Sequence, residues 1–271
     1  GQGGGGKGRG GEGQWSLLLL YFSYDTQVRE REVTALAAFP SAAAAAMGGE
    51  SSPAPLHTVF CAECTTYFDW KSAGVYWSHR AARMPGPITR LLACSEAQLA
   101  VYPPSSLAMG PTFVHPNLAA NPRTNETSGS YNKPAAVMYW ISQVPPEEDF
   151  ILFIDADMLL RAPINPLTLG ARRGLVVSEH VDYLDIGIRA GLVQQFVSDS
   201  VVGLAKAAGW WHIFHKEDLR TIAPRWLHWC ERMRAEPFRY WRTLGSDGRP
   251  IRGTREPPHG GVWVSMDIAT G

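Results

Sequence analysis

The stretch that decides the fold is Phe150-Ile151-Leu152-Phe153-Ile154, followed directly by Asp155-Ala156-Asp157. Five continuous apolar residues are typical of a strand in a sheet that is covered on both faces. In an open α/β sheet, ligands bind beyond the carboxyl ends of the strands, which is where the two aspartates would stand. Burying two unpaired carboxylates next to Met158 would be costly, so a partner for them is expected.

The two aspartates suggest a metal site. Two residues apart on an extended chain, Asp155 and Asp157 would point their carboxylates to the same side. Both could then bind one Mg²⁺ or Mn²⁺ ion that keeps open positions for phosphate oxygens and makes a diphosphate a better leaving group. An Asp-x-Asp pair alone is a weak signal, because Arg161 could instead neutralise one aspartate. From these residues alone, a metal site and an ion pair are both open.

Strands and helices alternate on both sides of this stretch. Short runs of apolar and β-branched residues predict further strands at 57–61, 88–94 and 175–177. Apolar residues near helical spacing predict helices at 67–83, 135–142, 192–208 and 218–234. Such alternation is typical of an α/β sheet, and the Pro/Gly/Asn-rich stretch 103–131 predicts a long loop or an insertion. The apolar side of the first helix would consist of Phe68, Trp70, Val75 and Trp77.

The composition indicates a globular chain with an unusual start. Of its 271 residues 45% are hydrophobic, which is enough for a substantial core. The 25 Lys and Arg residues cancel the 25 Asp and Glu residues, so no nucleic-acid partner is expected. Residues 1–55 are rich in Gly and Ala and predict a flexible lead and linker. The domain would then occupy 56–271, and it would be incomplete or divergent after about residue 240.

Neither a membrane anchor nor a redox compartment is indicated. The most apolar early run, Trp15 to Phe22, has eight residues, whereas a spanning helix needs about 20. We therefore expect no membrane anchor within this chain. The cysteines allow two disulfides in three pairings, or none. They are Cys61, Cys64, Cys94 and Cys230.

Several short segments, taken in order, are far more specific than the aspartate pair. They are His57-Thr58-Val59-Phe60, Tyr67-Phe68-Asp69-Trp70, Gly86-Pro87-Ile88-Thr89-Arg90-Leu91-Leu92, Pro111-Thr112-Phe113, Asn132-Lys133-Pro134-Ala135, Ile154-Asp155-Ala156-Asp157-Met158 and Leu169-Gly170-Ala171. Over about half its length the chain therefore resembles the peptidyl serine α-galactosyltransferase and hydroxyproline O-arabinosyltransferase-like family of plants and green algae.

The resemblance implies a GT-A-like fold, the nucleotide-diphospho-sugar transferase fold, with a mixed sheet and helices on both faces. It implies a glycosyltransferase that uses a UDP-sugar, galactose for the closer relatives, and a divalent metal, Mn²⁺ or Mg²⁺. The sugar would be transferred with retention to Ser or hydroxyproline hydroxyls of secreted hydroxyproline-rich proteins. The corresponding compartment is the lumen of the Golgi or endoplasmic reticulum. A catalytically inactive fragment or a lectin-like or scaffolding relative is the alternative.

The resemblance also assigns roles to residues on the donor side. Asp157 would be the direct metal ligand, and Asp155 would hold the metal or the ribose. Arg90, Asn132 and Lys133 are the candidates for donor contacts. Arg90 could instead form a surface salt bridge, and Asn132 could cap the helix that follows it. These alternatives stay open.

On the acceptor side, His215 and Asp218 are the weak catalytic candidates. For Asp218, an N-cap or first-turn acid of the following helix is the preferred interpretation. Enzymes of this fold often take a further metal ligand from their C-terminal part, where His259 is the nearby histidine. Four tryptophans could stack on sugar or peptide, although their spacing favours core packing. They are Trp210, Trp211, Trp226 and Trp229.

Overall fold

The computed structural model describes residues 54–180 and 208–235. Several predictions fall outside these ranges: nearly all of the lead at 1–55, the helix at 192–208 up to its last residue, the divergent part after about 240, and His259. No helix in the described ranges is both long and apolar enough to cross a membrane.

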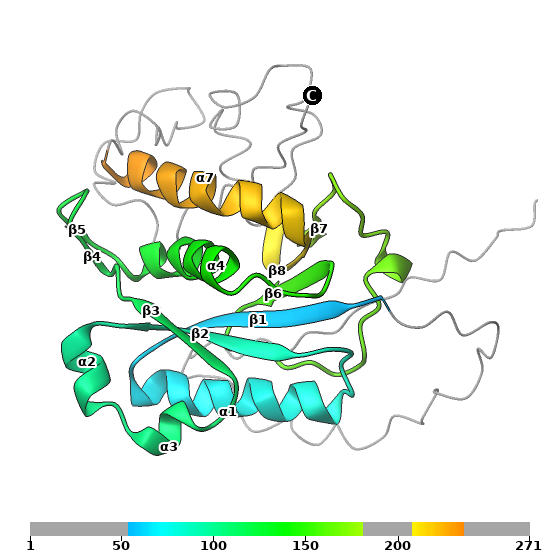
Figure 1. Cartoon of the computed structure of the whole chain (residues 1–271), viewed down its shortest axis with the longest axis horizontal. Helices are drawn as coiled ribbons and strands as arrows, with labels where there is room; N and C mark the ends of the chain where they lie inside the picture. Colours follow the sequence, from blue (N-terminus) through cyan, green and yellow to red (C-terminus); the bar gives the residue numbers. More distant parts are fainter. Residues whose placement is uncertain (1–53, 181–207, 236–271) are drawn as a thin grey trace, which may run out of the picture.

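A six-stranded sheet forms the centre of the described part (Figure 1). Its strands are β1 (Leu56–Glu63), β2 (Ile88–Cys94), β3 (Thr112–Pro116), β6 (Phe150–Ile154), β7 (Val177–His180) and β8 (Ala208–His215). They lie in the order β3-β2-β1-β6-β8-β7. The pairs among β1, β2, β3 and β6 are parallel, whereas β8 runs antiparallel to both β6 and β7. The sheet is therefore mixed, as the resemblance implied.

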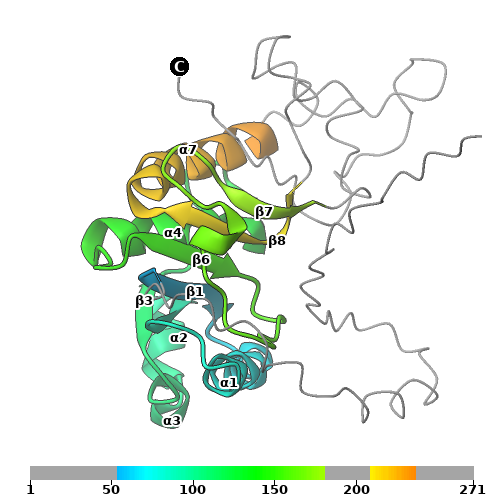
Figure 2. The same ribbon diagram turned by 90° about the vertical axis from the view of Figure 1, so that its right-hand side faces the viewer.

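Helices cover both faces of this sheet. Helix α1 (Thr66–Ala81) lies on one face, and α4 (Asn132–Gln143) and α7 (Lys216–Ala235) lie side by side on the other (Figures 1 and 2). The connection between β2 and α4 carries smaller elements. These are α2 (Glu96–Val101), α3 (Pro104–Leu107), the two-stranded ribbon of β4 (Ala120–Asn121) and β5 (Glu126–Thr127), and the 3₁₀ turn Gly129–Tyr131. The long loop predicted at 103–131 is thus mostly ordered structure, including the edge strand β3.

The central strand β6 confirms the burial that its sequence predicts. Its residues alternate between two cores, because successive side chains of a strand point to opposite faces. Leu152 and Ile154 belong to the core under α1, together with Val75. Ile151 and Phe153 belong to the core under α4 and α7. All five residues of β6 are buried, so the α/β class with both sheet faces covered is confirmed.

Helix α1 corrects one expectation about its apolar side. Phe68 and Val75 pack toward the core, whereas Trp70 and Trp77 are 56% and 62% exposed. Each pair is seven residues apart and so shares a helix face, but the two pairs are offset by two residues, about 200° around the helix. Counting all four as one side merged two opposite faces.

The region after β6 differs from the prediction as well. The strand predicted at 175–177 begins only at Val177, and Trp210 and Trp211 lie on a strand, β8, not on a helix. Trp211 is buried in the core under α1. Core packing is thus correct for Trp211, although the helical spacing that suggested it is not.

The order of the strands reverses at one place in the sheet. From β1 the chain moves outward to β2 and β3, and it then returns to the other side of β1 as β6. The order therefore reverses between β1 and β6. In α/β proteins, ligands bind beside such a reversal, at the carboxyl ends of the strands. Asp155 and Asp157 follow β6 at this point.

Candidate donor and metal site

The two aspartates lie on a tight turn at the carboxyl edge of the sheet. The backbone N–H of Met158 donates to the carbonyl oxygen of Asp155 at 3.2 Å, so the chain is not extended here. Each carboxylate pairs with a different lysine. Asp157 Oδ2 lies 3.2 Å from Lys71 Nζ, and Asp155 Oδ1 accepts a close contact from Lys133 Nζ. The predicted extended geometry is therefore wrong, and the aspartates reach toward helices on opposite faces.

Lys71 projects from α1 into a partly aromatic setting. Its side chain is only 8% exposed, and its ammonium lies 4.4 Å from the centroid of the Tyr67 ring and 5.6 Å from that of Phe68. Burial disfavours the charged form of Lys71, yet the contact with Tyr67 and the charge of Asp157 together outweigh burial and raise its pKa. Lys71 is therefore a cation, and Arg161, the partner suggested by sequence, is exposed.

Lys133 stands in the first turn of α4, on the other face. Its ammonium lies 5.7 Å from the centroid of the Phe153 ring. Burial, and in addition the charge of Lys133, lower the pKa of His212 on β8 to about 3. The His212 ring stacks on Phe153, and its Nδ1 lies 2.9 Å from Ser178 Oγ. Lys133 thus stands beside a neutral histidine and forms an ion pair with Asp155.

Asn132 neither caps α4 nor faces the aspartates. It has helical backbone angles, and its side chain is turned toward the preceding connection. Its Oδ1 accepts from the backbone N–H of Leu118 at 2.7 Å, while its Nδ2 donates to Glu63 and Asn117 at 2.9 Å each. The capping interpretation is therefore wrong. Asn132 ties the end of β1 and the segment after β3 to the start of α4, and its predicted donor contact stays a prediction.

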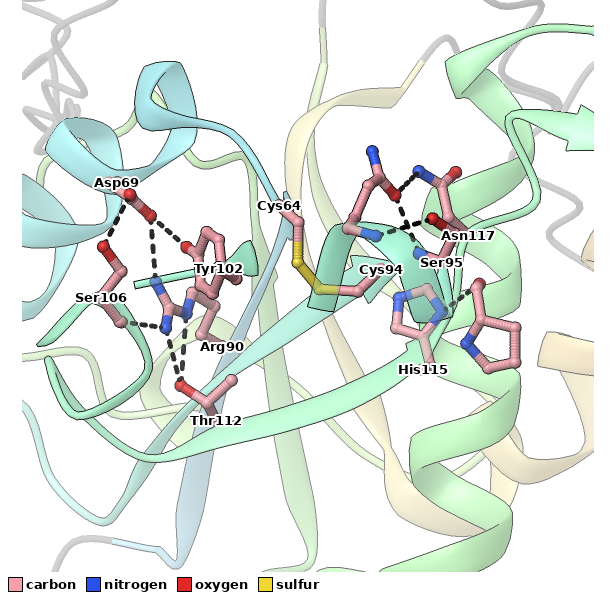
Figure 3. Close-up of a disulfide and its surroundings, with 12 residues drawn as sticks. Cys64, Asp69, Arg90, Cys94, Ser95, Tyr102, Ser106, Thr112, His115 and Asn117 are labelled. Atoms are coloured by element: carbon pink, nitrogen blue, oxygen red, sulfur yellow. Dashed lines mark hydrogen bonds and ion pairs between the residues drawn. A yellow bond between two sulfur atoms is a disulfide. The ribbon is translucent and has the colours of Figure 1, made fainter. Parts of the chain in front are cut away.

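Arg90 is fully buried in a polar network that Figure 3 shows. Its guanidinium donates to the Ser106 carbonyl at 2.6 Å and to Thr112 Oγ1, and it lies 3.8 Å from Asp69. Tyr102 and Ser106 also donate to Asp69. Burial, and further the hydrogen bond to Asp69, raise the pKa of Tyr102 to about 12. Neither the surface salt bridge nor an open phosphate contact describes Arg90, because it holds α1, α3 and β3 together.

His215 and Asp218 stand at the opposite end of the sheet from the aspartates. Since β8 is antiparallel to β6, His215 pairs with Phe150, the first residue of β6, while Ile154 pairs with Trp211. His215 Nδ1 accepts from the backbone N–H of Glu217, and Asp218 Oδ2 accepts from that of Gly174 at 2.6 Å. The interpretation of Asp218 as a first-turn acid is confirmed. Neither residue lies where it could act at Asp155 or Asp157.

A disulfide joins the carboxyl ends of β1 and β2. Cys64 and Cys94 follow the paired residues Glu63 and Ala93, and their Cα atoms are 5.3 Å apart (Figure 3). Cys61 is not bonded to another cysteine, and burial raises the pKa of its thiol. The described residues thus contain one disulfide, whereas the sequence suggested two or none.

The chemistry of the edge suits a hard cation held by few protein ligands. Side chains of Asp155 and Asp157 are 16% and 21% exposed, so an ion in solution can reach their oxygens. Within 54–180 and 208–235, no group of three or more His, Cys, Asp or Glu side chains is placed to hold a metal. Two carboxylates fit Mg²⁺ or Mn²⁺ bound largely through phosphate and water oxygens.

Comparison with known proteins places the chain in a family. The family model described as the hydroxyproline O-arabinosyltransferase family N-terminal domain matches residues 56–238. This chain belongs to that family. The match covers every described residue from β1 through α7 and includes both aspartates and both lysines.

Two relatives of the family are similar to this chain. A peptidyl serine alpha-galactosyltransferase of Arabidopsis thaliana is 36% identical over 205 residues, which are 73% of this chain and 24% of that protein. One of Chlamydomonas reinhardtii is 31% identical over 215 residues, 76% of this chain and 29% of that protein. The chain thus spans about a quarter of the length of these relatives. Among solved structures, the galactosyltransferase LgtC with donor and acceptor sugar analogs matches with a TM-score of 0.42 and 15% identity, over 66% of this chain and 65% of that one.

Lys71 is the residue of the site that the sequence analysis missed, although it lies next to one of the family segments. Lys71 directly follows the segment Tyr67-Phe68-Asp69-Trp70, which in the structure opens the helix after β1. A helix that follows a parallel strand starts at the carboxyl edge of the sheet. Polar residues in its first turns are therefore candidates for ligand binding at this edge. Lys71 could have been found by this argument.

Proposed function

We propose that this chain is the donor-binding part of a metal-dependent glycosyltransferase that acts on Ser or hydroxyproline hydroxyls of secreted hydroxyproline-rich proteins. The observation that carries the proposal is the position of Asp155 and Asp157 at the reversal of strand order, in a chain of the hydroxyproline O-arabinosyltransferase family. Two partly exposed carboxylates flanked by two lysines suit a cation together with a diphosphate.

Each polar residue at the carboxyl edge has a separate role in this proposal. Asp157 would be the direct metal ligand, Asp155 would hold the metal or the ribose, and Lys133 would contact the diphosphate. A bound Mn²⁺ or Mg²⁺ ion would supply charge neutralisation of the leaving diphosphate. Transfer with retention can proceed by attack of the acceptor hydroxyl on the face that the diphosphate leaves, so it needs no dedicated protein nucleophile.

For the donor, we propose UDP-galactose. The two relatives described above are named as galactosyltransferases, whereas the family model is named for arabinose transfer. Release of UDP should be faster from UDP-galactose than from UDP-arabinose at equal concentration. The reverse preference would replace galactose by arabinose and leave the rest of the proposal standing.

The decisive experiment follows UDP release with Mn²⁺, UDP-galactose and a peptide rich in Ser and hydroxyproline. Release is expected with the chain and with a full-length relative as positive control. Release by the relative alone would overturn the proposed activity of this chain. Calorimetric titration with UDP then distinguishes the non-catalytic alternative: binding of sugar or peptide that is indifferent to Mn²⁺ would indicate a lectin-like or scaffolding role.

We also propose that the protein works in the secretory pathway, in the Golgi or endoplasmic reticulum lumen. The disulfide between Cys64 and Cys94 supports this, because disulfides persist in oxidising compartments and are rare in the cytosol. Protein isolated from its native cells under thiol-blocking conditions should show Cys64 and Cys94 protected until reduction. Free thiols at both positions would contradict the proposal.

A further inference from the structure

The unusual feature of the carboxyl edge is that both aspartates are already neutralised. Lys71 pairs with Asp157 from α1, on one face of the sheet, and Lys133 pairs with Asp155 from α4, on the other. The two ammonium groups balance the charge of these two carboxylates. A divalent cation approaching the aspartates therefore meets two cations at close range, and the repulsion is strong because water is partly excluded.

The placement of the lysines favours an anion as their second partner. Lys133 is the second residue of α4, and Lys71 stands in the second turn of α1. The partial positive charge of a helix N-terminus disfavours cations there and favours anions. Lys133, in the first turn, thus holds a position that costs stability to α4, and an anion at this edge would interact with two ammonium groups at once.

In the same position, Lys71 also has a second partner, the ring of Tyr67. Its ammonium lies 4.4 Å from the centroid of the Tyr67 ring, one helical turn earlier, where a cation is attracted by the face of the ring. If the ammonium group of Lys71 separated from Asp157, the ring of Tyr67 would therefore still stabilise its charge. The side chain can release the carboxylate and remain at the same edge.

We propose that Lys71, together with Lys133, couples binding of the divalent cation to binding of the donor diphosphate. Without the diphosphate, the lysines occupy the aspartates and keep affinity for the cation low. The diphosphate attracts the ammonium groups, and the freed carboxylates then bind the cation. By reciprocity, the cation must raise the affinity for the diphosphate by the same factor. This inference rests on the proposed function, since it assigns Lys71 as a positioning residue of the same site.

The test measures Mn²⁺ binding by the electron paramagnetic resonance signal of free Mn²⁺, with and without UDP, so it does not depend on turnover. For the unaltered chain, UDP should tighten Mn²⁺ binding by about tenfold or more. Lys71→Met should tighten Mn²⁺ binding in the absence of UDP by about tenfold, and the effect of UDP should shrink accordingly. Lys71→Arg, which keeps the cation, should behave like the unaltered chain.

Lys216→Met is the matched control, because Lys216 pairs with Asp149 at 3.0 Å at the other end of the sheet. It should leave Mn²⁺ binding and its response to UDP unchanged. Thermal unfolding checks that Lys71→Met is folded. If the folded variant binds Mn²⁺ without UDP no more tightly than the unaltered chain, the inference is wrong and the proposed function is unaffected. If the unaltered chain binds no Mn²⁺ with or without UDP, both are overturned.

Discussion

The two ends of the six-stranded sheet carry the same kind of ion pair in different surroundings. At the carboxyl edge, Lys71 and Asp157 are 8% and 21% exposed at a separation of 3.2 Å. At the opposite edge, Lys216 and Asp149 are 22% and 56% exposed at 3.0 Å. The two distances are nearly equal, so the pairs differ in their burial and in the charges beside them.

The charges of the opposite edge serve the local structure. Helix α7 begins there, and its first-turn acids meet Arg220 and the backbone N–H of Gly174. Acids at a helix N-terminus stabilise the helix, so this arrangement needs no ligand to explain it. At the carboxyl edge, Lys71 in the second turn of α1 and Lys133 in the first turn of α4 pair with the two aspartates. Within the described residues, the carboxyl edge is therefore the one for which we propose binding of an anion and a cation.

The largest expected effect separates the two edges by activity. Asp157→Ala should lower metal-dependent UDP release by about 10²–10³-fold, because it removes the proposed direct metal ligand. Asp149→Ala, at the opposite edge, should leave the rate unchanged. UDP release with Mn²⁺ and the acceptor peptide measures both variants. Equal losses in the two variants would remove the functional difference between the edges.

A second variant tests whether Arg90 belongs to the donor site or to the scaffold. Arg90→Met should lower the free energy of unfolding by about 3 kcal/mol, since it leaves the carboxylate of Asp69 without its buried cation. Denaturant unfolding measures this loss, and Arg220→Met, in an exposed pair, is the control with an expected change of less than about 1 kcal/mol. UDP affinity of the folded protein should not change. A large loss of UDP affinity without loss of stability would return Arg90 to the donor site.

The third prediction concerns the pH dependence created beside Lys133. The pKa of His212 is about 3 in the folded chain and about 6.5 in the unfolded one, so the unfolded state gains a proton first as the pH falls. The contribution of neutral His212 to the free energy of unfolding is therefore complete above about pH 6.5. As the pH falls toward 3, the free energy of unfolding decreases by at most about 1.4 kcal/mol per pH unit. His212→Phe, which retains a ring to stack on Phe153, should flatten the decline in this window. An unaltered slope in acid unfolding would contradict the assignment.

The smallest effect is expected at the opposite edge. Lys216→Met should change the free energy of unfolding by less than about 1 kcal/mol, because water screens an exposed pair. Raising the salt concentration should abolish even this difference, whereas it should affect the more buried Lys71 pair less. Thermal unfolding of both lysine variants at low and high salt makes the comparison. A larger effect at Lys216 than at Lys71 would reverse the order of the two edges.

Much of the scaffold could be predicted from local patterns. The apolar stretch gives β6 its bounds, Phe150–Ile154, and the strand predicted at 88–94 is β2. Burial on both faces demands continuous apolar residues, so such strands are legible in the sequence. Strand β8, Ala208–His215, was not predicted, because histidines interrupt its apolar residues and its partner β6 lies more than fifty residues earlier.

The site divides in the same way. By itself the sequence determined that two aspartates end a buried strand, because strand and motif are contiguous, and the family segments determined the class of protein. The tertiary structure alone decided their partners. Lys71 and Lys133 are more than sixty residues apart and meet the aspartates only because α1 and α4 cover opposite faces of one sheet. The antiparallel course of β8 carried His215 and Asp218 to the far edge for the same reason: strand direction, which no local pattern contains, decides which residues share an edge.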